Sequence, residues 1–266
     1  GFVPPDEFIT IAEQAGLIEQ VTTWVMKQTI SDLAYFRGMG YGFTVAMNLS
    51  TQDIQNKVLL GKLVSLLTQE GLSPEALELE ITESDLVADA SLAIENLNEL
   101  TARGFHFAID DFGTGYSSLA YLKNLPVKTI KIDKSFILSL ASDENDQQIV
   151  HTVLSLANVF NLKVVAEGVE TAAQLRSLTE NNCDVIQGYF FSKPVPEVEL
   201  FDFIDKQILA IHKAMAKKVL AKPELIEQVK ETLELMHQHS LLEELLYAKF
   251  VEAQEQHTFL LVFVFL

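Results

Sequence analysis

Six apolar, strand-like runs of this chain each end on a carboxylate, an amide or a lysine, and a helical stretch follows every run. The residues that close these runs are Asn48, Glu80, Glu83, Asp110, Asp111, Lys131, Glu167, Glu170 and Gln187. Strands joined by helices run parallel, and active sites in such barrels lie at the carboxyl ends of the strands. Carboxylate and amide oxygens are the ligands that hard divalent cations prefer. The sequence therefore predicts that these residues form a metal site rather than separate surface charges.

The elements that must position these residues alternate between strand and helix. The expected strands span residues 41–48, 76–82, 105–110, 128–133, 162–167 and 184–190. The expected helices begin at Pro4 and at Glu19, then after a cap at Ser50 or Thr51, and then cover residues 86–103, 113–124, 145–160, 171–181 and 196–214. This alternation predicts an α/β fold, a parallel sheet covered by helices on both sides. A closed barrel of this kind needs eight strands, so we expect an incomplete TIM-like barrel that lacks one or two strands upstream of Gly1.

Composition narrows the class of protein. The 266 residues are 48% hydrophobic and 21% charged, which suits one large α/β domain. A net charge of −18, from 19 basic and 37 acidic residues, disfavours binding to a nucleic acid polymer or an anionic lipid surface. An anionic substrate would therefore need metal ions. The single cysteine, Cys183, excludes an internal disulfide, and we expect a cytoplasmic domain, within a parent protein that a membrane segment could anchor.

The architecture changes near residue 215, where strands give way to a sequence rich in Lys, Glu, Leu and Gln. We expect a barrel domain over residues 1–214 and a helical extension over residues 215–266, with amphipathic helices near 223–238 and 240–256. The chain ends in the apolar run FLLVFVFL, which is shorter than the roughly 20 residues of a membrane-spanning helix. A terminal strand, a truncated membrane segment and a frayed end all remain open. One hypothesis is that this run covers an open edge of the sheet.

The stretch DDFGTGYSSL, Asp110 to Leu119, is the most specific motif. Its paired carboxylates at a strand end repel each other unless a cation separates them. The other motifs are MNLS from Met47, ELEITES from Glu78, KIDKSF from Lys131, AEGVE from Ala166 and QGYFFSKP from Gln187. Together these motifs closely resemble the EAL domain family, over about residues 1–205. Members of that family are bacterial phosphodiesterases of the second messenger cyclic di-GMP.

The resemblance implies a two-metal site for Mg²⁺ or Mn²⁺ and hydrolysis of cyclic di-GMP to linear pGpG. It implies that Asn48, Glu80 and Asp110 bind metal and that Asp111 contacts the second ion. Glu167 would bind metal or activate water, and Lys131 would contact the nucleophilic water.

The resemblance also implies the parts of the pocket that surround the metals. Glu83 would tether the loop that contains Phe112, Gly113, Thr114 and Gly115. Glu170 and Gln187 would complete the substrate pocket. Family members often form homodimers and carry sensor or diguanylate cyclase domains, so we expect such partners for the parent protein.

Each residue also has a plain interpretation when it is taken alone. Glu83 could cap the helix that follows its strand, and Asn48 could be a turn residue. Lys131 could be a solvated charge and Gln187 a loop amide.

One feature departs from the family. The letters Glu75-Ala76-Leu77 precede the ELEITE strand, so they are not the Glu-Ala-Leu signature, whose metal-binding glutamate we expect upstream of Gly1. We therefore expect impaired hydrolysis in this chain. The alternative functions are a receptor that binds cyclic di-GMP without cleaving it, and another metal-dependent barrel enzyme.

Overall fold

The computed structural model describes residues 3–82, 90–114, 122–196, 199–204 and 206. The chain divides into two compact units with a boundary between Phe191 and Ser192, and the first unit holds the sheet. The predictions for the two helices after residue 215, for FLLVFVFL and for the boundary at residue 214 lie outside the described residues. Within those residues, no helix is both long enough and apolar enough to cross a membrane.

The sheet contains six parallel strands that pair in chain order, from β1 to β6. They are β1 (Val45–Asn48), β2 (Leu77–Thr82), β3 (His106–Phe112), β4 (Thr129–Ile132), β5 (Lys163–Ala166) and β6 (Val185–Ile186). The α/β class and the incomplete TIM-like barrel are thereby confirmed. The strand predicted over residues 184–190 is too long. After Gln187 the backbone turns, because the N–H of Phe191 donates to the carbonyl of Gly188 at 3.1 Å.

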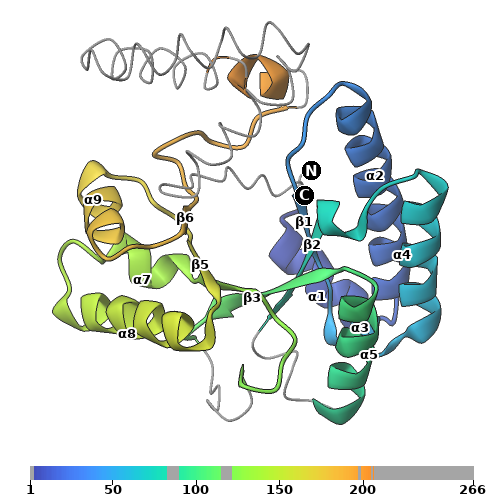
Figure 1. Cartoon of the computed structure of the whole chain (residues 1–266), viewed down its shortest axis with the longest axis horizontal. Helices are drawn as coiled ribbons and strands as arrows, with labels where there is room; N and C mark the ends of the chain where they lie inside the picture. The colour runs from blue at the N-terminus through green and yellow to red at the C-terminus, as the bar shows by residue number, and fades with distance from the viewer. Residues whose placement is uncertain (1–2, 83–89, 115–121, 197–198, 205, 207–266) are drawn as a thin grey trace, which may run out of the picture. The chain divides into compact units, whose positions relative to one another are not determined.

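Two of the described helices precede β1, and the others named here lie between successive strands (Figure 1). The helices are α1 (Pro5–Gln14), α2 (Ile18–Gly38), α3 (Thr51–Gln55), α4 (Lys57–Gln69), α5 (Ala90–Ala102), α7 (Lys134–Leu138), α8 (Glu144–Phe160) and α9 (Ala172–Glu180). Figure 1 shows α2 and α4 beside β1 and β2, and α7, α8 and α9 beside β5 and β6.

Two details of the helices differ from the prediction. The stretch after Ser50 forms two helices instead of one, because Asn56 leaves the helical conformation and its side chain caps the second of them, α4. The short helix α7 was missed. The carboxylate of Asp133 caps it by accepting from the N–H of Ser135 at 2.9 Å.

The alternation within the strands separates an apolar face from a polar one. Leu77, Leu79 and Ile81 of β2 are fully buried in the hydrophobic core. Side chains of a strand alternate between faces, so Glu78 and Glu80 lie on the opposite face. There Glu78 accepts a hydrogen bond from the Thr129 hydroxyl at 2.7 Å. The predicted site residue Glu80 therefore lies on the same face as Glu78, opposite the apolar side chains of β2.

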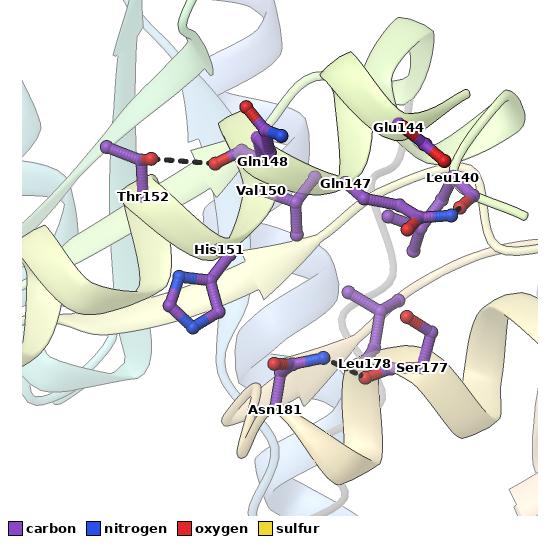
Figure 2. Close-up of a pocket in the computed structure, with 10 residues that line it drawn as sticks. All are labelled: Leu140, Glu144, Gln147, Gln148, Val150, His151, Thr152, Ser177, Leu178 and Asn181. Carbon is purple, nitrogen blue, oxygen red and sulfur yellow. Dashed lines mark hydrogen bonds between the residues drawn. The ribbon is translucent and has the colours of Figure 1, made fainter.

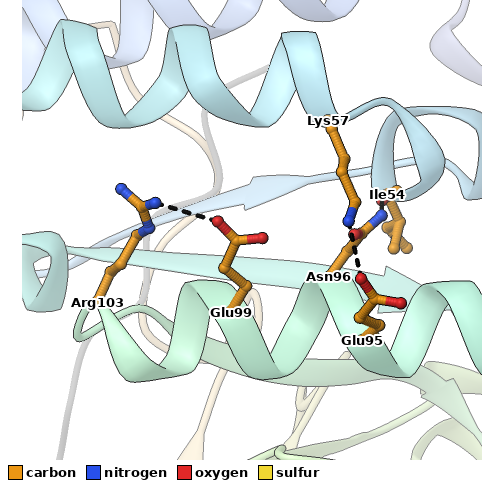
Figure 3. Close-up of polar contacts among 6 residues, drawn as sticks. All are labelled: Ile54, Lys57, Glu95, Asn96, Glu99 and Arg103. Atoms are coloured by element: carbon orange, nitrogen blue, oxygen red, sulfur yellow. Dashed lines mark hydrogen bonds and ion pairs between the residues drawn. The ribbon is translucent and has the colours of Figure 1, made fainter.

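Polar contacts fix helix α5 against the elements that follow β1 (Figure 3). The buried Asn96 donates from Nδ2 to the carbonyl of Ile54 at 2.8 Å. The exposed Lys57 ammonium lies 2.8 Å from the Glu95 carboxylate. Since α5 runs between β2 and β3, the buried Asn96 bond holds the connection between two strands that carry predicted site residues, whereas the exposed ion pair adds little.

Candidate metal site at the strand ends

The Lys131 ammonium lies at the centre of the site, in contact with three carboxylates. Its Nζ is 2.8 Å from Glu80 Oε1, 3.0 Å from Asp110 Oδ1 and 2.7 Å from Glu167 Oε1. The lysine belongs to β4, and its partners belong to β2, β3 and the residue after β5. Four side chains that the sequence predicted to be functional are thus brought together from four neighbouring strands.

Burial sets the protonation of this cluster. Lys131 is 2% exposed and Glu80 is 1% exposed. Burial raises the pKa of Glu80 to about 7 against the attraction of Lys131, and repulsion from Asp110 adds to the rise. Burial likewise raises the pKa of Glu167. For Lys131, burial alone would lower the pKa, but the charges of Glu80, Glu167 and Asp110 outweigh it and raise the pKa. The lysine is therefore a fixed cation at neutral pH.

A bulge in β3 accommodates the adjacent acids Asp110 and Asp111. Pairing with β4 shifts by one residue between Ile109, which faces Ile130, and Phe112, which faces Ile132. Asp111 takes a left-handed conformation at φ 52°, and its N–H donates to Asp110 Oδ1 at 3.0 Å. In a regular strand, adjacent side chains would point to opposite faces. The extra residue changes the direction of Asp111 and ends the regular pairing at the site.

Asp133 is a member of this cluster that the sequence analysis did not single out. It shares a side-chain hydrogen bond with Asp111. Burial, the charge of Asp110 and the presence of Asp133 raise the pKa of Asp111 to about 6. Burial alone would raise the pKa of Asp133, but hydrogen bonds from Ser135 and Asp111 outweigh burial and lower it. The motif KIDKSF contained the signal, since Asp133 also follows a predicted strand.

The remaining predicted residues lie around this centre to different degrees. Asn48 is exposed at the end of β1, in register with Glu80. Gln187 follows β6, and its buried Oε1 has no hydrogen-bond partner among the described residues. Glu170 is exposed, four residues from the end of β5. Their separate positions show that the four-residue cluster around Lys131 is the part that the structure assembles directly.

The loop after β3 is described only at its start. Phe112 is buried, and Gly113 has φ 99° and lies against the ring of Phe136. Thr114 donates from its hydroxyl to the carbonyl of Asp111 at 2.8 Å. Glu83 and Gly115 lie outside the described residues, so the predicted tether between Glu83 and this loop stays a prediction.

Comparison with known proteins identifies the family to which the chain with this strand-end site belongs. Residues 1–194 match the EAL domain. The chain belongs to the EAL domain family. This EAL domain is 39% identical over 204 residues to the signaling protein YkoW of Bacillus subtilis. It is 40% identical over 205 residues to the cyclic di-GMP phosphodiesterase NbdA of Pseudomonas aeruginosa. Each alignment covers 77% of this chain and 26% of the relative, so the chain spans about a quarter of the curated relatives' length.

Solved structures agree with the sequence comparison. The PaMucR phosphodiesterase in complex with c-di-GMP superposes with a TM-score of 0.72 at 40% identity, over 75% of this chain and 81% of that chain. The FimX EAL domain from Pseudomonas aeruginosa, bound to c-di-GMP, gives a TM-score of 0.66 at 30% identity, over 72% and 77% of the two chains. This EAL domain is therefore homologous to cyclic di-GMP phosphodiesterases.

The residue types in this EAL domain fit divalent metal ions. Three carboxylates surround one cation, and all the donors are hard oxygens of the kind that Mg²⁺ and Mn²⁺ take. Glu80 Oε2 is buried without a hydrogen-bond partner among the described residues, as is Gln187 Oε1. Buried oxygens without partners are costly, and an ion would satisfy them. In the described part of the chain, no three His, Cys, Asp or Glu side chains are already arranged to hold an ion, and the Lys131 ammonium lies among the acids.

A cavity of about 580 Å³ in this EAL domain lies apart from the strand-end acids (Figure 2). Figure 2 shows His151 and Gln148 of α8 on one side, and Ser177 and Asn181 at the carboxyl end of α9 on the other. No predicted site residue lines it. Its lining has no cluster of charges comparable with that around Lys131, so the strand-end cluster is the better candidate for chemistry on a phosphodiester.

Proposed function

We propose that this EAL domain binds cyclic di-GMP at the carboxyl ends of its strands and hydrolyses one phosphodiester bond to give linear pGpG. The observation that carries this proposal is the contact of the Lys131 ammonium with three carboxylates from different strands. Homology to cyclic di-GMP phosphodiesterases supports the same substrate.

The metal site in this proposal uses the oxygens at the strand ends. Asn48, Glu80 and Asp110 would hold one Mg²⁺ or Mn²⁺ ion, and Asp111 would contact a second, with Glu167 near both. Bound there, the two ions would neutralise the charge of the phosphodiester and acidify a water molecule.

Side chains of this EAL domain supply the other roles in the proposed reaction. Lys131 holds a positive charge at neutral pH, so it can orient the attacking water and stabilise negative charge that develops on the phosphate. The raised pKa of Glu167 makes this carboxylate a better acceptor for a proton from water than an ordinary glutamate. Gln187 and Glu170 would contact the substrate from the loops after β6 and β5.

Product formation tests the proposal. The chain is incubated with cyclic di-GMP and Mn²⁺, and linear pGpG is separated by liquid chromatography. We expect Glu80→Gln and Asp110→Asn to lower the rate by at least about a hundredfold, since each removes a charge from the metal site. Glu95→Gln, at an exposed ion pair remote in the fold, is the matched control and should leave the rate unchanged. Equal rates in all four proteins would contradict the proposal.

A receptor without catalysis is the second candidate, and one observation favours it. Lys131 places one positive charge among three carboxylates, so the chain itself balances part of the charge that metal ions would otherwise neutralise. The impaired hydrolysis that the sequence predicts points the same way. Titration calorimetry with cyclic di-GMP separates the two functions, because a receptor binds the nucleotide while no pGpG appears.

We also propose that the parent protein carries further signalling domains. Among the relatives, the bifunctional diguanylate cyclase/cyclic di-GMP phosphodiesterase MucR of Pseudomonas aeruginosa is 40% identical over 201 residues, which are 29% of its length. A homodimer remains part of this proposal, and sedimentation velocity over a range of protein concentrations tests it.

A further inference from the structure

We propose that Gln174 is a positioning residue, whose buried amide ties the loop carrying Glu167 and Glu170 to helix α7. The inference rests on the proposed function, because it concerns the geometry of the same metal site. Gln174 does not reach the carboxylate cluster through any described contact, so its role is to act through the loop.

Both the oxygen and the nitrogen of the Gln174 side-chain amide form hydrogen bonds, and these bonds connect the loop to α7. It is 3% exposed, and its Oε1 accepts from the N–H of Glu170 and from the N–H of Thr171, each at 2.8 Å. Its Nε2 donates to the carbonyls of Ile137 at 3.0 Å and Leu138 at 3.2 Å. Buried amides of this kind fix geometry, because each lost partner leaves a buried polar group unpaired.

The two ends of this bridge belong to different parts of the site. Ile137 and Leu138 end α7, the helix that Asp133 begins. Glu170 and Thr171 end the loop that starts at Glu167. Strand β4 carries Lys131. Gln174 therefore links the segment that follows β4 to the loop that follows β5.

Two further contacts determine the path of the loop. The N–H of Glu167 donates to the carbonyl of Ile132 at 3.3 Å, and the N–H of Val169 donates to the carbonyl of Gln187 at 3.1 Å. A side chain at Gly168 would place its Cβ 2.7 Å from Lys134 Cβ. The loop is thus held at its start by β4, at its middle by the segment after β6, and at its end by Gln174.

Gln174 has two roles: its side chain bridges to α7, and it also caps the start of α9. Two substitutions at this position distinguish these roles. Gln174→Leu removes all four hydrogen bonds. Gln174→Glu keeps an acceptor for Glu170 and Thr171 but loses the donor to Ile137 and Leu138. The matched control is Thr171→Val, which removes the other half of the capping box, the bond from the Gln174 N–H to Thr171 Oγ1 at 3.3 Å, and leaves the bridge intact.

Mn²⁺ binding to the whole chain, followed by electron paramagnetic resonance, is the first measurement. We expect both Gln174 variants to weaken Mn²⁺ binding by about tenfold or more, as loss of a supporting hydrogen bond does at metal sites. Thr171→Val should bind Mn²⁺ with an affinity within about twofold of that of the unaltered chain. Unchanged affinity in both Gln174 variants, or equal weakening by Thr171→Val, would overturn the inference.

Hydrogen exchange of the backbone amides gives a readout that needs no metal. Peptides that cover Glu167 to Thr171 should exchange faster in both Gln174 variants than in Thr171→Val, while the strands keep their protection. If the unaltered chain binds no Mn²⁺, the proposed function fails, but this comparison still decides the role of Gln174. Equal exchange in Gln174→Glu and in the unaltered chain would show that the bridge does not hold the loop.

Discussion

At the scale of single residues, the site depends on a balance of buried charge. One ammonium faces three carboxylates, and the pKa values of Glu80 and Glu167 are raised by burial even so. A buried ion pair contributes little net stability, but removal of one partner leaves the other charge buried without compensation. The cluster is therefore sensitive to the loss of its cation and to pH.

Loss of that cation is the first prediction. Lys131→Met should lower the free energy of unfolding by about 3 to 5 kcal/mol without metal, because three carboxylates then repel one another in a buried site. Added Mn²⁺ should recover part of the loss by replacing the positive charge. Urea denaturation with EDTA and with Mn²⁺ measures both effects. Lys57→Met, which removes an exposed cation paired with Glu95, serves as the control and should change stability little. A Lys131→Met protein as stable as its parent would contradict the charge balance described here.

The pH dependence of stability is the second prediction. The pKa of Glu80 rises from 4.5 to about 7 on folding, so the folded state binds more protons than the unfolded state between these values. Stability from this group is complete below about pH 4.5 and is lost as the pH rises through 7. The raised pKa values of Asp111 and Glu167 act in the same direction. Without metal, we expect the free energy of unfolding to fall by about 1 to 3 kcal/mol from pH 5 to pH 8.

Divalent ions should reverse that trend, because they bind the deprotonated carboxylates. Chemical denaturation at both pH values, with EDTA and with Mn²⁺, is the measurement. Glu80→Gln serves as the control, since it removes one titrating group and should make the pH dependence of stability shallower. A metal-free protein that gains stability from pH 5 to pH 8 would be incompatible with the raised pKa of Glu80.

At the scale of the elements, close packing of loops sets where the strand-end residues lie. Gly168 has φ 72°, and Gly188 approaches the backbone of Val169 so closely that an added Cβ would lie 2.1 Å from its carbonyl oxygen. The loops after β5 and β6 are thus pressed together at Val169. This contact brings Gln187 next to the loop that carries Glu167.

A pair of glycines tests the importance of that packing, and it forms the third prediction. Gly168 and Gly71 have similar φ angles, 72° and 66°, but of the two only Gly168 has a close neighbour at its Cβ position. Alanine at Gly71 should cost about 1 kcal/mol, from the left-handed conformation alone. Alanine at Gly168 should cost at least about 1 kcal/mol more, because its Cβ would overlap Lys134. Urea denaturation of both variants measures the difference, and equal costs would show that the loop can move aside.

The elements also show how far sequence patterns reach. The two-residue alternation of ELEIT and the apolar runs predicted β2 to β5 within a few residues, since both patterns are local. The end of β6 and the separation of α3 from α4 were not predicted. The end of β6 depends on where the chain turns to meet a distant neighbour, as the N–H of Phe190 does at the carbonyl of Val169, 2.9 Å away. The break between α3 and α4 depends on the conformation of the single residue Asn56.

At the scale of the whole molecule, net charge controls the approach of an anionic ligand. The chain carries 37 acidic and 19 basic residues, for a net charge of −18. A surface potential of this sign repels cyclic di-GMP before any contact is made. Ions bound at the strand ends would reduce the repulsion where the ligand must bind.

Salt dependence gives the fourth prediction. In EDTA, the association rate of cyclic di-GMP should rise several-fold between roughly 20 and 200 mM NaCl, because the screening length shrinks to about 10 Å or less. With Mn²⁺ bound, the dependence should weaken. Stopped-flow fluorescence measures the rates, and guanosine, which is uncharged, is the control ligand. A rate that falls with added salt in EDTA would mean that a positive local field guides the ligand.

The sequence by itself determined the alternation of strand and helix, the residues at each strand end and the family, because all three follow from local order along the chain. Only the tertiary structure decided that Lys131 lies between Glu80, Asp110 and Glu167, that β3 bulges at Asp111 and that Gln174 bridges two loops. The contacts of Lys131 and Gln174 join residues that are up to 51 positions apart, and the bulge depends on how β3 pairs with β4. The reason is physical: which oxygen faces which cation depends on strand register and loop packing, and neither is encoded at one position.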